Sequence, residues 1–276
     1  MIAWATRLIT AGMAVGIPLV PPASPDASAP VRTRPLIIGH RGWSARLPEN
    51  TLGAIDAALD AGADGVECDV RRCEDGHIVL MHDETVDRTT DGTGRVADLT
   101  LTELRALNAC RPREPRFADV QPEPVPTLEE ALTHVRGRGV ALLDMKEEGI
   151  VEPVAGIVRG LDMESDVILC SWTSRNAERV REALPGSASA VIAAIPEDLP
   201  PTYFTDWTRV GVRCFSANER TVTPEFVRAA HLRAMSVFVW TVNEPERMQV
   251  LREMGVDAIL TDAPDVAIEA TMWPPA

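Results

Sequence analysis

The most unusual feature of this 276-residue chain is how little lysine it contains. Lys146 is the single lysine among 27 basic residues, and all the others are arginine. Arginine carries a planar fork of donors, whereas lysine carries a compact point charge on a flexible stem. The one lysine therefore indicates a site where a point charge fits and a planar guanidinium does not.

A basic surface and metal-binding cysteine patterns are also missing. The formal net charge is −14, whereas nucleic-acid-binding proteins carry basic faces, so we expect no nucleic-acid partner. An anionic small molecule remains compatible with this charge if a metal, arginine or lysine reverses the sign locally. The five cysteines are odd in number and lack metal-ligand spacing, and a chain of this size does not indicate a disulfide framework. We expect them to be small core residues.

Long apolar runs are absent except near the N-terminus. Arg7, the apolar residues 8–20 and the small residues 27–29 follow the pattern of a secretory signal peptide. The apolar stretch is too short for a transmembrane helix, and no other run approaches a membrane span. We therefore expect residues 1–34 to be a signal peptide and the protein to be exported. The alternative, favoured by Pro30, is a disordered leader on a cytoplasmic protein.

From residue 35 onward, short apolar runs alternate with amphipathic, helix-like segments. The strand candidates are residues 36–39, 65–70, 78–81, 140–143, 167–170, 190–194, 211–215, 235–240 and 258–260. Thr100 and Thr127 begin capping boxes, and Thr223 precedes a proline, which are start signals for helices. This alternation over residues 35–270 predicts one α/β domain, a TIM (β/α)8 barrel. The alternative is a doubly wound sheet, but no Gly-rich phosphate loop follows the first strand.

Nine strand candidates are one too many for an eight-stranded barrel. Residues 74–76 form a tight turn between the second and third runs, so these two runs must be antiparallel. We expect part of this hairpin to rise over the barrel mouth. Residues 84–126 form the longest stretch between strand candidates and predict a small insertion after the third strand, with one helix at 101–108.

Carboxylates gather where the predicted strands end. Side chains alternate along a strand, so Glu67 and Asp69 point to one side, as do Asp144 and Lys146. The carboxyl ends of barrel strands face the active site. Converging carboxylates repel one another unless a cation joins them, and an all-oxygen set selects Ca²⁺ or Mg²⁺. We therefore predict a divalent metal on Glu67, Asp69 and Asp144; the alternative is an ion-paired surface cluster.

Two histidines and an arginine stand beside these carboxylates. His40 and His82 end the first and third runs, and because histidine titrates near neutrality, one can accept a proton while the other donates one. Arg41 can hold a phosphate oxygen in its fork; its alternative is a surface ion pair. This combination predicts hydrolysis of a phosphodiester. The remaining histidines are expected to be structural: His77, His134 and His231.

The motifs, taken in order, resemble those of the glycerophosphodiester phosphodiesterase family. They are His40-Arg41-Gly42, Pro48-Glu49-Asn50-Thr51, Glu67-Cys68-Asp69-Val70, Asp75-Gly76, His82-Asp83, Asp87-Arg88-Thr89-Thr90, Trp240-Thr241-Val242-Asn243, Gly255-Val256-Asp257 and Thr261-Asp262-Ala263-Pro264. The resemblance covers about residues 35 to 265. It implies a barrel of the phospholipase-C-like phosphodiesterase type, a divalent metal, and cleavage of glycerophosphodiesters to an alcohol and sn-glycerol 3-phosphate.

The resemblance also implies roles for the residues that match the motifs. Glu67 and Asp69 would be metal ligands, His40 and His82 the acid–base pair, and Arg41 and Lys146 phosphate contacts. The glycerol 2-hydroxyl would attack phosphorus, and water would then open the cyclic phosphate. Three further residues are expected in the substrate pocket: Glu49, Trp172 and Trp240.

The chain departs from the family pattern at Asp144, where many members carry glutamate. The shorter side chain must come closer to the metal or bind it through water. Aspartate at this place resembles the sphingomyelinase D branch, so a lysophospholipase D or sphingomyelinase D-like lipid phosphodiesterase is the alternative function. Trp172 stands where phenylalanine is common, which should change the pocket shape. A non-catalytic binding barrel is a third hypothesis, but no catalytic histidine or acidic ligand is missing.

Overall fold

The computed structural model describes residues 34–110, 117 and 119–272. Residues 1–33 of the predicted leader, which was expected over residues 1–34, lie outside the described residues.

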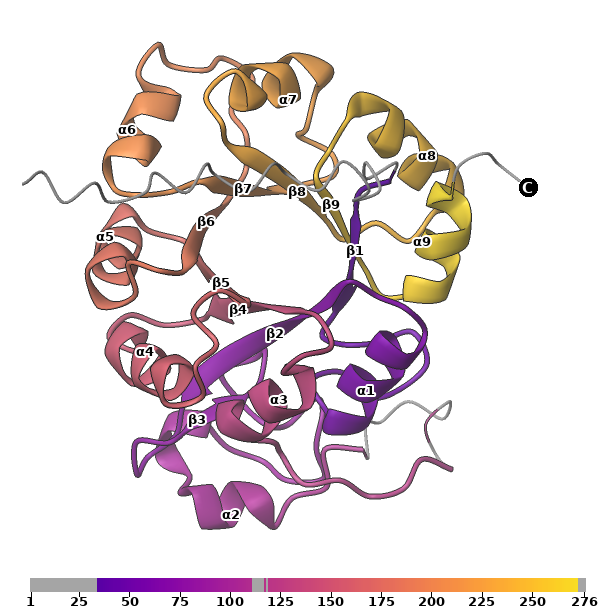
Figure 1. Ribbon diagram of the computed structural model, residues 1–276. Helices are drawn as coiled ribbons and strands as arrows, with labels where there is room; N and C mark the ends of the chain where they lie inside the picture. Colours follow the sequence, from indigo (N-terminus) through magenta and orange to yellow (C-terminus); the bar gives the residue numbers. More distant parts are fainter. Residues whose placement is uncertain (1–33, 111–116, 118, 273–276) are drawn as a thin grey trace, which may run out of the picture. The chain divides into compact units, whose positions relative to one another are not determined.

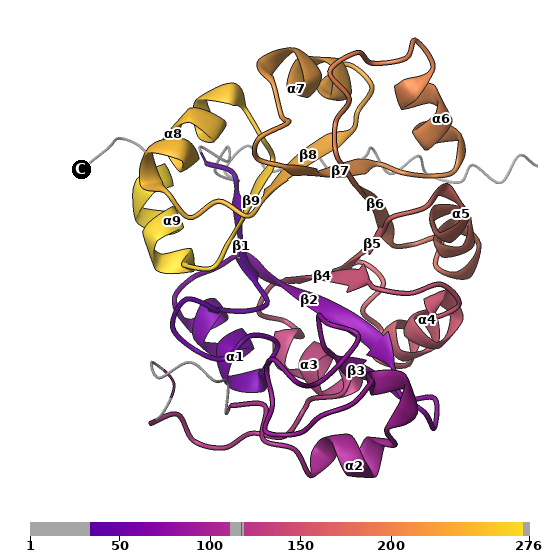
Figure 2. The same cartoon turned by 180° about the vertical axis from the view of Figure 1, so that it is seen from behind.

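Eight parallel strands close into a barrel within the described part of the chain (Figures 1 and 2). They are β1 (Leu36–His40), β2 (Gly65–Arg72), β4 (Val140–Met145), β5 (Val167–Ser171), β6 (Ala188–Ala193), β7 (Cys214–Asn218), β8 (Ser236–Trp240) and β9 (Ala258–Thr261). The barrel closes because β1 pairs with both β2 and β9, so that Ile38 lies opposite Gly65 on one side and Leu260 on the other. The predicted TIM barrel is confirmed.

Helices surround the barrel strands in both views of the ribbon (Figures 1 and 2). Their bounds are α1 (Leu52–Asp60), α2 (Leu101–Arg105), α3 (Leu128–Val135), α4 (Val151–Gly160), α5 (Ser174–Ala183), α6 (Tyr203–Arg209), α7 (Pro224–His231), α8 (Pro245–Met254) and α9 (Pro264–Thr271), with a short 3₁₀ turn at Val96–Asp98. None of these described helices combines the length and the apolar character needed to cross a membrane.

The predicted helix starts at Thr100 and Thr127 are confirmed, because each side chain accepts from the third helical N–H and both capping boxes are complete. Helix α2 ends at Arg105 rather than at residue 108. Beyond it, the Asn108 N–H donates to Asp91 instead of continuing the helix. Strand β7 begins at Cys214, later than predicted, because Gly211 still belongs to the turn that ends α6.

The surplus strand is β3 (Ile78–Leu80), which pairs antiparallel with β2 and lies outside the parallel barrel. The predicted hairpin is therefore confirmed. His82 follows β3, so it reaches the site from the hairpin and not from the end of a barrel strand. The Arg71 side chain donates to the His82 carbonyl at 2.9 and 3.1 Å, and this ties the returning arm to β2.

Alternation along the strands divides the core into an inner and an outer part. Ile38, Leu142 and Phe238 belong to the apolar cluster inside the barrel, whereas Ile37 and Leu143 pack outward with the helices. All five cysteines are buried, as predicted for small core residues. Polar residues that follow these apolar residues along the same inward-facing rows therefore lie at the barrel mouth.

Candidate active site

The carboxyl ends of the barrel strands surround a cavity that is partly open to solvent. Nearly all the predicted site residues line it: His40, Arg41, Glu67, Asp69, His82, Asp144, Lys146, Trp172 and Trp240. The rest of its wall is mainly apolar and comes from Cys170, Ile192, Ser216 and Leu260. A partly enclosed pocket with an apolar wall and a few converging charged groups suits a small molecule.

Three buried carboxylates meet in this cavity. Ligand oxygens of Glu67, Asp69 and Asp144 all lie within 4.8 Å of one another. Burial raises the pKa of Glu67 well above its ordinary value, and the charges of Asp69 and Asp144 raise it further. Burial also raises the pKa of Asp144. An oxygen-only set whose charges repel in this way fits a hard divalent cation such as Ca²⁺ or Mg²⁺.

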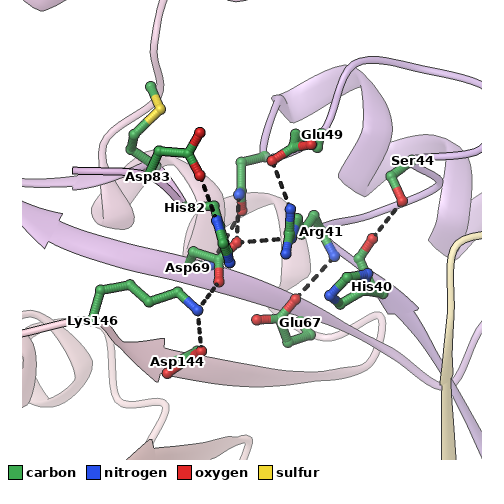
Figure 3. A network of polar contacts seen from close by, with 12 residues as sticks. His40, Arg41, Ser44, Glu49, Glu67, Asp69, His82, Asp83, Asp144 and Lys146 are labelled. Carbon is green, nitrogen blue, oxygen red and sulfur yellow. Dashed lines mark hydrogen bonds and ion pairs between the residues drawn. The ribbon is translucent and has the colours of Figure 1, made fainter. Parts of the chain in front are cut away.

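Two cationic side chains hold the carboxylates in place (Figure 3). The Lys146 Nζ lies 2.8 Å from Asp69 Oδ1 and also pairs with Asp144, and its side chain is only 11% exposed. The Arg41 Nε lies 3.1 Å from Asp69 Oδ2, and the Arg41 backbone N–H donates to Glu67 at 3.0 Å. Although burial raises the pKa of Asp69, Arg41 and Lys146 bring it below its ordinary value. Lysine's compact ammonium group fits between two carboxylates in this way.

Neutral donors from neighbouring loops orient the same carboxylates. The Asn50 side chain donates to Asp69 Oδ2 at 2.8 Å and accepts from the Asp69 backbone N–H at 3.1 Å. The Trp172 Nε1 donates to Asp144 Oδ1 at 2.9 Å. The loops after β1 and β5 therefore fix the direction of carboxylates carried by β2 and β4.

His40 is held by Asp262, which directly follows the last barrel strand, β9. Its Nδ1 lies 2.7 Å from Asp262 Oδ1, and Asp262 also accepts from Ser44 Oγ at 2.8 Å and from Asn243 Nδ2 at 2.7 Å. Burial raises the pKa of Asp262, but the hydrogen bonds outweigh it and bring the pKa to about 2. With Asp262 ionised, Nδ1 is the protonated ring nitrogen in the neutral imidazole, and Nε2 is left for proton exchange.

His82 has a matching partner in the next residue. Its Nδ1 lies 2.7 Å from Asp83 Oδ1, and Figure 3 shows the two side chains together. Hydrogen bonds from Arg88 lower the pKa of Asp83 to about 2. The cavity is thus lined by two imidazoles, each held by an ionised carboxylate.

The family model of the glycerophosphoryl diester phosphodiesterase family matches residues 40–266. The chain belongs to the glycerophosphodiester phosphodiesterase family. It is therefore an enzyme of the phosphoric diester hydrolase class, as the motifs predicted. Its sequence is 33% identical over 239 residues to the glycerophosphodiester phosphodiesterase of Caldanaerobacter subterraneus subsp. tengcongensis. The alignment covers 84% of this chain and 96% of the relative.

Solved structures of this family share the barrel. An Oleispira antarctica phosphodiesterase in complex with the product sn-glycerol-3-phosphate aligns with a TM-score of 0.77 at 26% identity, covering 86% of this chain and 96% of the other. The glycerophosphodiester phosphodiesterase of Agrobacterium tumefaciens aligns with a TM-score of 0.72 at 27% identity, covering 84% of this chain and 98% of the other.

Sequence reasoning overlooked several residues of this phosphodiesterase site. Asp83, Asp262 and Asn50 stand inside the family motifs but were given no role. The predicted pocket residue Glu49 does not line the main cavity. Its carboxylate instead bonds to Arg41 at 2.9 Å and lines a neighbouring hollow. His134 and His231 pair with aspartates elsewhere in the fold, outside the cavity.

Proposed function

We propose that this protein hydrolyses glycerophosphodiesters to sn-glycerol 3-phosphate and an alcohol, with a divalent metal and with His40 and His82 as the acid–base pair. One observation carries the proposal: both imidazoles and the buried carboxylates line a single cavity. The product complex of the Oleispira antarctica relative supports the same substrate class.

Glu67, Asp69 and Asp144 are the residues that would hold the metal. The ion would supply positive charge to the phosphate oxygens in a cavity whose own carboxylates would otherwise repel them. Arg41 and Lys146 would add charge-assisted contacts to the same oxygens. With the ion bound, the local charge of the cavity would be positive although the net charge of the protein is −14.

The two histidines would divide the proton transfers between them. One Nε2 accepts the proton of the glycerol 2-hydroxyl as that oxygen bonds to phosphorus, and the other protonates the alcohol oxygen as its bond to phosphorus breaks. The roles then reverse: a water molecule loses a proton to one histidine as its oxygen bonds to phosphorus, and the bond between phosphorus and the glycerol 2-oxygen breaks as that oxygen takes a proton from the other histidine. Asp83 and Asp262 keep both rings aimed at the cavity.

The test incubates purified protein and divalent ion with glycerophosphocholine, glycerophosphoethanolamine and lysophosphatidylcholine. We expect release of sn-glycerol 3-phosphate from the two deacylated substrates. Hydrolysis confined to lysophosphatidylcholine would favour the lipid phosphodiesterase alternative that Asp144 suggests. Hydrolysis of none of the three would overturn the proposal.

A further inference from the structure

Arg88 lies in the loop after β3 and does not line the catalytic cavity, yet it joins two carboxylates. Its Nη1 and Nη2 donate to the two oxygens of Glu49, each at 2.8 Å. Its Nε and Nη2 donate to the two oxygens of Asp83, at 2.6 and 3.2 Å. All three guanidinium nitrogens are used in one planar arrangement, which only arginine can make.

Each of these carboxylates contacts a residue that faces the phosphate in the proposed reaction. Asp83 Oδ1 lies 2.7 Å from His82 Nδ1, and Glu49 Oε1 accepts from Arg41 Nη1 at 2.9 Å. Figure 3 shows Asp83 beside His82 and Glu49 beside Arg41. A continuous chain of hydrogen bonds therefore runs from the imidazole through Arg88 to the guanidinium of Arg41.

The charges along this chain keep it intact at neutral pH. Burial raises the pKa of Glu49, but hydrogen bonds from Arg88 and the charge of Arg41 bring it below its ordinary value. Hydrogen bonds to Glu49 and Asp83 raise the pKa of Arg88. Both carboxylates are thus ionised and accept from fixed directions. The chain of hydrogen bonds also joins the loop after β1, which carries Glu49, to the loop after β3, which carries Arg88.

We propose that Arg88 is a positioning residue that sets the proton-transfer group His82 and the phosphate contact Arg41 in one geometry. The inference rests on the proposed function. Arg88 acts only through Asp83 and Glu49, so its loss would affect two steps together. Loss of the Asp83 carboxylate would affect mainly proton transfer, and loss of the Glu49 carboxylate mainly substrate binding.

The test compares steady-state hydrolysis of glycerophosphocholine by four variants. We expect Arg88→Ala to lower kcat/KM by about 10- to 100-fold, with kcat falling and KM rising together. Asp83→Asn should lower mainly kcat, and Glu49→Gln should raise mainly KM. Free guanidinium, well below denaturing concentrations, should partly restore Arg88→Ala, because the wild-type side chain is 47% exposed and leaves an accessible site. Arg88→Lys should stay impaired, because an ammonium group cannot bridge both carboxylates.

Arg95 provides the matched control, since it is an ion-paired arginine of the same loop, 58% exposed, that contacts Glu84 and not this chain of bonds. Arg95→Ala should keep wild-type kinetics and show no response to guanidinium. Near-normal kinetics in Arg88→Ala or Arg88→Lys would overturn the proposal. So would a loss of activity that guanidinium does not restore, because Arg88 would then only stabilise the loop. An inactive wild-type protein would instead refute the proposed function itself.

Discussion

The Nδ1 of His40 lies 2.7 Å from Asp262 Oδ1, although 222 positions separate the two residues in the chain. His40 ends β1 and Asp262 follows β9, and these strands are neighbours only because the barrel closes. Closure of the fold therefore completes a histidine–carboxylate pair that neither end of the chain could form alone.

Asp262→Asn should lower kcat by at least about 10-fold while the protein stays folded. The amide cannot hold the His40 ring in the tautomer that leaves Nε2 ready for proton exchange, and each positioned proton-transfer group is worth roughly 10²- to 10⁴-fold. The measurement is kcat for glycerophosphocholine together with the melting temperature. Asp56→Asn is the control, because Asp56 pairs with a second histidine, His134, and neither residue lines the cavity. Equal kcat in Asp262→Asn and wild type would contradict this role.

The Asp83 carboxylate should stabilise the fold in a pH-dependent way. Its pKa is about 2 in the folded protein against an ordinary 3.8, chiefly because Arg88 donates to it. A depressed pKa stabilises the folded state above the unfolded pKa, and this contribution is lost as the pH falls toward the folded pKa. The difference in melting temperature between wild type and Asp83→Asn should therefore be constant from pH 7 to 5 and shrink from about pH 4 downward. A melting-temperature difference that grows as the pH falls would contradict a stabilising role of the ionised Asp83 carboxylate.

Divalent ions should raise the melting temperature of the wild type but not that of Glu67→Gln. Saturation at about 100 times Kd stabilises a protein by about 2.7 kcal/mol. In the presence of chelator, Glu67→Gln should be at least as stable as wild type, because the pKa of buried Glu67 is raised by burial and by two neighbouring carboxylates. Thermal melts with and without Ca²⁺ or Mg²⁺ check both statements. An equal response of the two proteins to the ion would exclude Glu67 as a ligand.

Lys146→Arg should sharply reduce activity even though the charge is kept. The Lys146 side chain is only 11% exposed, and its ammonium group lies between Asp69 and Asp144, where a planar guanidinium would have to displace one of them. Hydrolysis rates of this variant and of the surface variant Arg138→Lys make the comparison. A Lys146→Arg rate close to wild type would mean that the lone lysine has no special role at this site.

Local pattern predicted much of this site from the sequence. Period-two alternation correctly put Glu67 with Asp69 and turned Cys68 outward, and a tight turn at Gly76 correctly made β3 antiparallel. These features depend only on neighbouring residues.

Long-range partners could not be predicted in the same way. Asp262 reaches His40 through the pairing of the last strand with the first, and Arg88 reaches Glu49 across 39 positions. No periodicity encodes which loops meet above a barrel. Glu49 was expected in the substrate pocket for the same reason. The sequence does not show that two arginines bind its carboxylate in the folded protein.

The most direct measurement follows release of sn-glycerol 3-phosphate from glycerophosphocholine by the wild type and by His82→Ala, each with divalent ion and with chelator. We expect the chelator to stop the wild-type reaction and restored Ca²⁺ or Mg²⁺ to recover it. We also expect His82→Ala, with an unchanged melting temperature, to be roughly 10²- to 10⁴-fold slower. Hydrolysis that continues in chelator would refute the need for a metal, and a folded His82→Ala protein with wild-type rates would refute the role of His82 in proton transfer.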